Sequence, residues 1–434
     1  MTNDQKQDVL DFISKMNQKY GNLPKSCHNM GEFKDRIFYG GPNFDSGELL
    51  AGVGNFLFGK WLSSGEAVHE FELNFSKKFN NRFSLMVNSG SSANLIMVAA
   101  TKKHLNWKND DEIIVSPVGF PTTISAILIN NLKPIFIDIE YDTLNFDVSL
   151  IESKITNKTK CIFVSPVLGN PPDFDKLLDI CKKYNLVLLL DNCDSLGSKW
   201  NNKYLNEYSI ASSCSFFPSH HITSGEGGMI STNNNEIINI ARSMVNWGRK
   251  CYCLGADNLL TNGTCGARFA RWIPGQDYIL DHKYVYGEMG FNLKPIDLQG
   301  AIGVEQLKKF DKFAEDRRNN YTIIKNLFDK HVKGIKFVSI LDKADPCWFG
   351  LPIIVDNNKN KTKLVKYLEI NSVQTRNYFS GNILLHDAYK YLESYLNYPL
   401  SNLVLNNVFF VGVSPTYTEK HIAYIEKVLS GYES

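Results

Sequence analysis

The sequence predicts an α/β protein: a large domain built on a mostly parallel, doubly wound sheet of seven strands, followed by a smaller α/β domain at the C-terminus. Short apolar, β-branched runs recur along the chain from about residue 80. Helix-like stretches such as Ala93–Lys103 and Phe174–Tyr184 separate several of these runs, an alternation typical of βαβ units. The runs are apolar on both faces, as expected for strands that helices cover on both sides.

The expected strands of the large sheet are Phe83–Val87, Glu112–Val115, Pro134–Asp138, Cys161–Ser165, Leu186–Asp191, Ser212–Phe216 and Met229–Ser231. Ligands of such sheets bind at the carboxyl ends of the strands, so functional groups are expected directly after these runs. Further along the chain, Leu298–Leu327 predicts a long helix, and a helix around Lys420–Leu429 closes the C-terminal domain.

Three regions are expected. Residues 1–40 form a polar helical arm, with Val9, Leu10, Phe12 and Ile13 on one apolar face and GNLPK near residue 21 ending the helix. Residues 41–310 form the large domain and residues 311–434 the small one. Residues 245–290 interrupt the strand and helix pattern with a segment rich in Gly, Cys, Trp and Tyr. Long irregular inserts of this kind more often have a functional role than none.

The composition excludes several function classes. The chain has 434 residues, 47 of them basic and 45 acidic. Its net charge of +2 lacks the excess of basic residues that is typical of a protein that binds nucleic acid. No apolar run approaches the roughly 20 residues that a membrane helix needs, and the N-terminal MTNDQKQDVL is unlike a signal peptide. We therefore expect a cytoplasmic protein. Its nine cysteines, an odd number, argue against a disulfide framework.

The first motif that carries chemistry is NSGSSANLI, residues 88–96, which follows an expected strand and opens a helix. Gly90, Ser91 and Ser92 would place backbone N–H groups and hydroxyls at the positive end of that helix, where a phosphate can bind. The alternative is a serine-capped helix without a ligand.

Two further motifs follow later strands. Asp191 ends a very apolar strand, where a carboxylate needs a partner such as the protonated ring nitrogen of a cofactor. Capping of the next turn is the alternative role. The segment SFFPSHHITSGEGGMI, residues 215–230, carries the pair His220–His221 before a glycine-rich stretch. This pattern is typical of a flexible catalytic loop, and structural histidines are the alternative.

Taken in order, these segments resemble the sugar-modifying branch of the fold-type-I pyridoxal-phosphate enzymes, the DegT/DnrJ/EryC1/StrS aminotransferase family. The resemblance covers roughly residues 40–434. It implies that Gly90, Ser91 and Ser92 form the turn that binds the cofactor phosphate, and that Ser215 adds a further phosphate contact.

The resemblance also implies roles around the cofactor ring. Phe120 matches the aromatic residue that stacks on the pyridine ring, and Asp191 matches the carboxylate that pairs with the pyridine nitrogen. That carboxylate keeps the nitrogen protonated, which makes the ring a better electron sink. Asn292 matches an asparagine that reaches the phosphate of the neighbouring subunit's cofactor, which implies a homodimer.

One departure from the family pattern decides the expected chemistry. The sixth residue of the SFxPxK motif, the lysine that tethers pyridoxal phosphate in the aminotransferases, is His220 here. This exchange resembles the 3-dehydratases of nucleotide-linked 4-keto-6-deoxy sugars, which use untethered pyridoxamine phosphate. In these enzymes the histidine moves a proton while the hydroxyl on carbon 3 is expelled. A homologue that binds nucleotide sugar without turnover is the alternative.

The cysteines separate two types of 3-dehydratase. Between Cys193 and Cys251 lie 57 residues, one residue separates Cys251 from Cys253, and eleven separate Cys253 from Cys265. The first two spacings resemble the [2Fe–2S] motif of the CDP-4-keto-6-deoxy-D-glucose 3-dehydrases, and the last loop is longer than usual in that family. Four thiolates suit such a cluster. Zinc in the same thiolates and the absence of any metal are the alternatives.

The resemblance implies a substrate and partners. A nucleotide sugar, CDP-linked in the cluster-bearing family, would lose its carbon-3 hydroxyl in 3,6-dideoxyhexose synthesis for O-antigen lipopolysaccharide. Electrons would reach the cluster from a separate NADH-dependent flavin and iron–sulfur reductase. The other type resembles GDP-4-keto-6-deoxymannose 3-dehydratase, which uses pyridoxal phosphate and glutamate without metal. Arg376, beside Asn377 and Tyr378, is a candidate for binding the substrate pyrophosphate, and an exposed structural arginine is the alternative.

Overall fold

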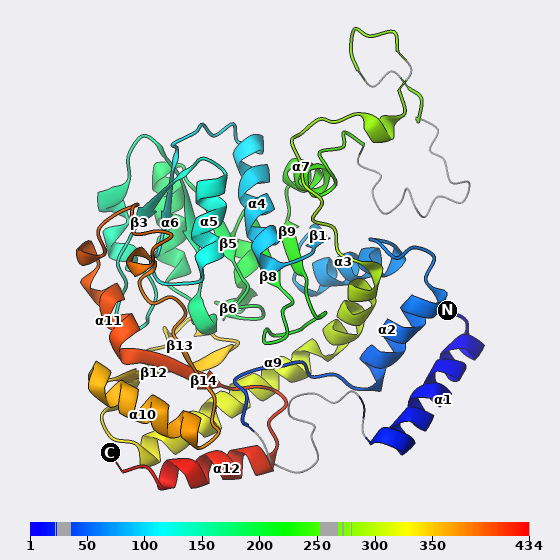
Figure 1. Cartoon of the computed structure of the whole chain (residues 1–434). Coiled ribbons are helices and arrows are strands. Elements are labelled where there is room, and N and C mark those ends of the chain that lie inside the picture. Colours follow the sequence, from blue (N-terminus) through cyan, green and yellow to red (C-terminus); the bar gives the residue numbers. More distant parts are fainter. Residues whose placement is uncertain (22, 24–35, 252–267, 271–272, 279, 434) are drawn as a thin grey trace.

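The computed structural model describes residues 1–21, 23, 36–251, 268–270, 273–278 and 280–433. A seven-stranded sheet is built from strands within residues 83–232 (Figure 1), with the strand order β1-β9-β8-β5-β4-β2-β3. The strands are β1 (Phe83–Val87), β2 (Glu112–Val115), β3 (Lys133–Phe136), β4 (Thr159–Val164), β5 (Val187–Asp191), β8 (Ala211–Ser215) and β9 (Gly228–Thr232).

This sheet is mostly parallel, as the sequence predicts. Strands β3, β2, β4, β5 and β8 pair in parallel, whereas β9 runs antiparallel to both of its neighbours, β8 and β1. The helices that flank it are α4 (Gly90–His104), α5 (Pro121–Ile129), α6 (Phe174–Tyr184) and α7 (Asn235–Val245). The family fold predicted from the sequence is therefore confirmed.

Successive apolar side chains of the strands point to opposite faces of the sheet and form one apolar layer on each face. In β2, Ile113 and Val115 pack with α4, α5 and α7 on one face, whereas Ile114 packs with α6 on the other. Side chains of successive strand residues point to opposite faces of a sheet, so a strand that is apolar throughout needs cover on both sides. These two layers fix the carboxyl ends of the strands, where the site lies.

A second sheet forms the C-terminal part of the chain. It is antiparallel, with the order β10-β12-β14-β13, and it packs against the second half of α9. Its elements are β10 (Ile335–Phe337), β12 (Gly350–Val355), β13 (Thr375–Asn377), β14 (Val408–Gly412), α10 (Asn358–Ile370), α11 (Pro399–Asn407) and α12 (Glu419–Ser430). A small third sheet holds β6 (Lys199–Trp200), β7 (Lys203–Tyr204) and β11 (Ala344–Asp345).

The long helix α9 (Asp297–His331) joins the two main parts of the chain. Its first half packs against α2 (Ser46–Phe58) and α3 (Glu66–Lys78), and its second half packs against the C-terminal sheet. The helix begins one residue before and ends four residues after the predicted Leu298–Leu327. The predicted domain boundary between residues 310 and 311 falls inside this continuous helix, and the division into domains stays a prediction.

The N-terminal arm begins with α1 (Asn3–Tyr20), which lies beside α2 (Figure 1). Val9 and Ile13 are buried as predicted, whereas Phe12 is half exposed. The helix ends at Tyr20, immediately before the GNLPK segment. In the described part of the chain, no helix is both long enough and apolar enough to cross a membrane.

Candidate active site

A cavity of about 750 Å³ opens at the carboxyl ends of the central strands. Ser89 and Gly90 follow β1, Asp191 ends β5 and Ser215 ends β8, and all four line this cavity. The C-terminal part of the chain closes the opposite wall. The full set of lining residues brings together most of the positions predicted from sequence: Gly90, Ser91, Phe120, Asp191, Cys193, Ser215, His220 and Arg376.

One end of the cavity is the N-terminus of α4. The Ser89 hydroxyl caps this helix by accepting a hydrogen bond from the backbone N–H of Ser92 at 3.1 Å. The N–H groups of Gly90 and Ser91 precede the first intrahelical hydrogen bond, so they remain available to an anion. A Cβ atom on Gly90 would lie 2.5 Å from the Cβ of Ser215, so only glycine fits here. Ser92, also predicted as a contact, does not line the cavity.

Asp191 is held by neutral donors inside the cavity wall. Its Oδ2 accepts hydrogen bonds from Asn94 Nδ2 and from the Thr123 hydroxyl, both at 2.7 Å, and its Oδ1 accepts from the backbone N–H of Cys193 at 3.2 Å. The carboxylate is only 4% exposed and forms no ion pair with any residue that the structure describes. Its negative charge therefore stays available to a cationic group of a ligand.

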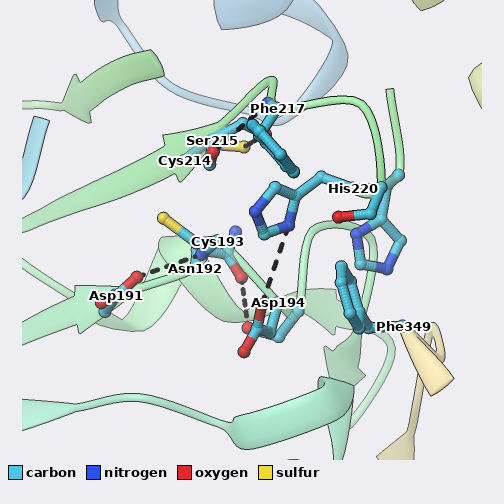
Figure 2. Close-up of polar contacts among 12 residues, drawn as sticks. Asp191, Asn192, Cys193, Asp194, Cys214, Ser215, Phe217, His220 and Phe349 are labelled. Carbon is cyan, nitrogen blue, oxygen red and sulfur yellow. Dashed lines mark hydrogen bonds and ion pairs between the residues drawn. The ribbon is translucent and has the colours of Figure 1, made fainter. Parts of the chain in front are cut away.

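His220 lies in the same cavity, on the loop between β8 and β9 (Figure 2). Its Nδ1 points toward Asp194, with 3.7 Å between Nδ1 and Oδ1, and has no hydrogen-bond partner within the described part of the chain. Burial, together with the positive charge of Arg317, lowers the pKa of His220 to about 3. The imidazole is therefore neutral at cellular pH and able to accept a proton.

The pKa of Asp194 is shifted upward, whereas that of His220 is shifted downward. Burial, reinforced by the negative charge of Asp191, raises the pKa of Asp194 to about 8. This carboxyl group therefore carries a proton at neutral pH, whereas the neighbouring imidazole of His220 does not. Two titratable groups whose environments push their pKa values apart are typical of an acid and base pair in an enzyme.

These residues fit the cofactor that the sequence resemblance implies. The phosphate would lie at the N-terminus of α4, between Ser91 and Ser215. The backbone and side chains there are packed so closely that Gly90 has no room even for a methyl group. A protonated pyridine nitrogen would meet the uncompensated carboxylate of Asp191. Phe120, half exposed on the cavity wall, offers its ring face for stacking. No lysine lines this cavity, so none of the described lining residues could tether the cofactor covalently.

The predicted cluster ligands are only partly described. Cys193 lines the cavity two residues after Asp191 (Figure 2), and burial, together with the charge of Asp191, raises the pKa of its thiol well above the usual value. Cys251 is buried but does not line the cavity. Cys253 and Cys265 lie outside the described residues. Among the residues that the structure describes, no group of three or more His, Cys, Asp or Glu side chains could hold a metal ion.

Two other predicted residues lie at the edge of the site or away from it. Asn292 is exposed, accepts a hydrogen bond from Lys294 Nζ at 2.7 Å and does not line the cavity of its own chain. Its predicted contact with a neighbouring subunit stays a prediction. Arg376 is exposed at the cavity wall, and its guanidinium lies 4.5 Å from the ring centroid of Tyr39.

The structure adds residues that the motifs did not indicate. Asp194, Phe349, Phe379 and Phe410 line the cavity, as does Tyr39 from the N-terminal segment. Asp194 could have been found, because it lies in the polar run DNCDS that directly follows the strand ending in Asp191. The three phenylalanines and Tyr39 come from distant segments, and no local pattern distinguishes them from core residues.

Comparison with known proteins agrees with this geometry. A relative from Salmonella typhimurium, the lipopolysaccharide biosynthesis protein RfbH, is 35% identical and spans 84% of each chain. The dTDP-4-dehydro-2,6-dideoxy-D-glucose 3-dehydratase of Saccharopolyspora spinosa is 34% identical over 86% of this chain and 81% of its own length.

A solved structure extends the comparison to the fold. The E. coli GDP-4-keto-6-deoxy-D-mannose-3-dehydratase with bound hydrated PLP superimposes with a TM-score of 0.79 and 29% identity, covering 91% of this chain and 99% of that chain. The family model of the DegT/DnrJ/EryC1/StrS aminotransferase family matches residues 45–430. Because that match covers most of the sequence, the chain belongs to the DegT/DnrJ/EryC1/StrS aminotransferase family.

Proposed function

We propose that the protein removes the carbon-3 hydroxyl of a nucleotide-linked 4-keto-6-deoxyhexose, with pyridoxamine 5′-phosphate bound in the central cavity without a covalent tether. The observation that carries this proposal is His220, which occupies the lysine position of the family motif and faces the cavity beside Asp191 and Asp194. Relatives named as nucleotide-sugar 3-dehydratases support it. The relative named as a lipopolysaccharide biosynthesis protein supports a role in surface-polysaccharide synthesis.

In this proposal, residues of the chain bind the cofactor and transfer protons. The N-terminus of α4, with Ser91 and Ser215, binds the cofactor phosphate, and Asp191 holds a proton on the ring nitrogen. When bound, the cofactor supplies an electron sink next to carbon 4 of the sugar. His220 accepts a proton as the neutral base, and protonated Asp194 is placed to return one. In the net dehydration, one proton and the carbon-3 hydroxide leave together as water.

A substrate survey tests the proposal. The purified protein, supplied with pyridoxamine phosphate, is offered CDP-linked and GDP-linked 4-keto-6-deoxyhexoses, and the products are followed by mass spectrometry. We expect loss of the carbon-3 oxygen from at least one of them. If both sugars bind and neither is converted, with or without a reductase and with or without glutamate, the non-catalytic alternative is correct.

A second variant tests the motif assignment. His220→Lys restores the lysine of the family pattern at a position that faces the cavity. With pyridoxal phosphate, this variant is expected to show a new visible absorption band from a covalent bond between the cofactor and the lysine. The matched control is His386→Asn, on the exposed surface, which leaves the spectrum unchanged. A missing band in the lysine variant would contradict the assignment of position 220.

Two routes complete the reaction, and the named relatives favour the metal-free one. In that route hydrolysis would release the 3-deoxy product, with the amine nitrogen leaving as ammonia, and glutamate would restore the amine form of the cofactor while becoming 2-oxoglutarate. This is the GDP-4-keto-6-deoxymannose 3-dehydratase type, to which the solved structure belongs by name.

A specific observation keeps the iron–sulfur route as the second candidate. Cys193 lies in the cavity, and it is followed by Cys251 and Cys253 at the spacing of the cluster-bearing family. In this route these cysteines would hold a cluster, which would supply single electrons that come from a separate NADH-dependent flavin and iron–sulfur reductase. Anaerobic purification followed by iron and acid-labile sulfide analysis decides between the routes. About two irons and two sulfides per chain would establish the cluster. If neither iron nor sulfide is found, the metal-free route is the one that the protein uses.

A further inference from the structure

Arg317 is a fully buried cation in the middle of α9. Its side chain is 1% exposed, and it forms no salt bridge with any residue that the structure describes. Burial lowers its pKa to about 10, so the guanidinium still carries its charge at neutral pH. Burying a charge without an opposite charge is costly unless hydrogen bonds compensate. The partners of this side chain therefore indicate what it does.

Within the described part of the chain, its two Nη atoms donate hydrogen bonds to backbone carbonyls of two segments that line the cavity, whereas its Nε has no partner there. Nη2 donates to the oxygens of Ser219 at 3.3 Å and His220 at 2.9 Å. Nη1 donates to the oxygens of Trp348 at 3.3 Å and Phe349 at 3.2 Å. The planar guanidinium thus joins two segments that are distant in sequence. The rings of His220 and Phe349, which those segments carry, lie 5.1 Å apart between their centroids.

The imidazole of His220 has few other contacts that hold it, namely a hydrogen bond with the backbone of Cys193 and the neighbouring carboxyl group of Asp194. Its Nδ1 has no hydrogen-bond partner among the described residues, and its backbone N–H donates within the loop, to the oxygen of Phe217 at 3.0 Å. We propose that Arg317 is a positioning residue, which fixes His220 in the cavity by clamping the carbonyls on both sides of the site. This inference rests on the proposed function, because it assigns the clamp to the proposed base.

The clamp is tested first without any substrate. Hydrogen–deuterium exchange of residues 217–223 is compared between the wild-type protein and Arg317→Met. We expect exchange in this segment to be faster by about tenfold or more, with the strands of the large sheet unchanged. The matched control is Arg318→Met, because Arg318 pairs with Asp345 and does not line the cavity. Unchanged exchange in residues 217–223, or equal acceleration across the whole chain, would overturn the proposal.

Steady-state kinetics then tests positioning against simple loss of structure. A displaced base slows the chemical step more than it weakens binding. For Arg317→Met we therefore expect kcat for dehydration to fall by about tenfold or more, while KM for the nucleotide sugar changes less than about twofold. Arg317→Lys keeps the charge but cannot span four carbonyls, so it should recover only part of kcat. Full wild-type kcat in Arg317→Met would contradict the clamp.

The two proposals can fail separately. If the wild-type protein dehydrates no nucleotide sugar, the proposed function is wrong, and the exchange experiment still decides whether Arg317 orders the His220 loop. If dehydration is observed and the exchange of residues 217–223 does not respond to Arg317→Met, only the clamp is wrong.

Discussion

At Gly90 the wall of the cavity has no room for a side chain. A Cβ atom there would lie 2.5 Å from the Cβ of Ser215 and 3.1 Å from the Sγ of Cys193. Gly90→Ala should therefore lower the free energy of unfolding by about 1–3 kcal/mol, the usual cost of overpacking, and weaken binding of pyridoxamine phosphate. Urea unfolding and a fluorescence titration measure the two effects.

The control for this prediction is another helical glycine, Gly52 in α2. A Cβ atom at Gly52 would meet Leu298 Cδ1 at 3.4 Å, an ordinary contact. Gly52→Ala should therefore leave cofactor affinity unchanged. Equal cofactor affinity in Gly90→Ala and the wild-type protein would show that the N-terminus of α4 is not the phosphate site.

Residues of the site differ in how far the sequence reveals them. Asp191 ends an apolar strand and His220 lies in the loop that follows β8, so their place at the carboxyl edge of the sheet could be predicted. The pKa shifts of His220 and Asp194 could not, because burial is the largest cause of both and the charge of Arg317 reaches His220 only through tertiary folding. Phe349 could not be predicted either, since its place depends on how the C-terminal sheet docks.

Among the elements, α9 depends on one buried carboxylate at its first turn. Oδ1 of Asp297 accepts hydrogen bonds from the backbone N–H groups of Gly65 at 2.9 Å and Val68 at 3.0 Å, and its Oδ2 accepts from Asn55 Nδ2 at 2.9 Å. Asp297 thus connects α9 to α2 and to the first turn of α3.

Asp297→Ala should lower the free energy of unfolding by about 2 kcal/mol or more, because it leaves two buried donors and one partly buried donor without an acceptor. Urea denaturation measures this effect. The control is Asp311→Ala, on the exposed side of the same helix, where the pair with Lys78 should contribute no more than about 1 kcal/mol. A loss at Asp297 no larger than at Asp311 would contradict the role of this carboxylate.

The sequence predicts elements better than it predicts their directions. All seven strands of the large sheet could be located, because their apolar runs are continuous and separated by helical patterns. The antiparallel direction of β9 could not be predicted, since an apolar run carries no sign of direction. The third sheet was also missed, because its two-residue strands β6, β7 and β11 are too short to show periodicity.

For the whole molecule, His220 makes stability sensitive to acid. Its pKa is about 3 in the folded protein, against an ordinary value of 6.5. Between these values the unfolded chain binds a proton that the folded protein does not, so the free energy of unfolding falls as pH falls from about 6.5 toward 3. This contribution is fully present above pH 6.5.

Unfolding by urea at several pH values, in the wild-type protein and in His220→Asn, measures this effect. The asparagine variant lacks the titrating group. Its free energy of unfolding should therefore fall less steeply between pH 6 and 4, by a difference approaching about 1.4 kcal/mol per pH unit, the value for one proton. Identical slopes would show that His220 is protonated in the folded state.

We propose His220 as the base of a dehydration carried out with an untethered cofactor. The most direct test of this proposal is the rate of dehydration by His220→Asn at saturating pyridoxamine phosphate and nucleotide sugar. We predict a fall of about 100-fold or more relative to the wild-type protein, with cofactor affinity retained and His386→Asn unaffected. A near wild-type rate in His220→Asn would show that His220 is not the base.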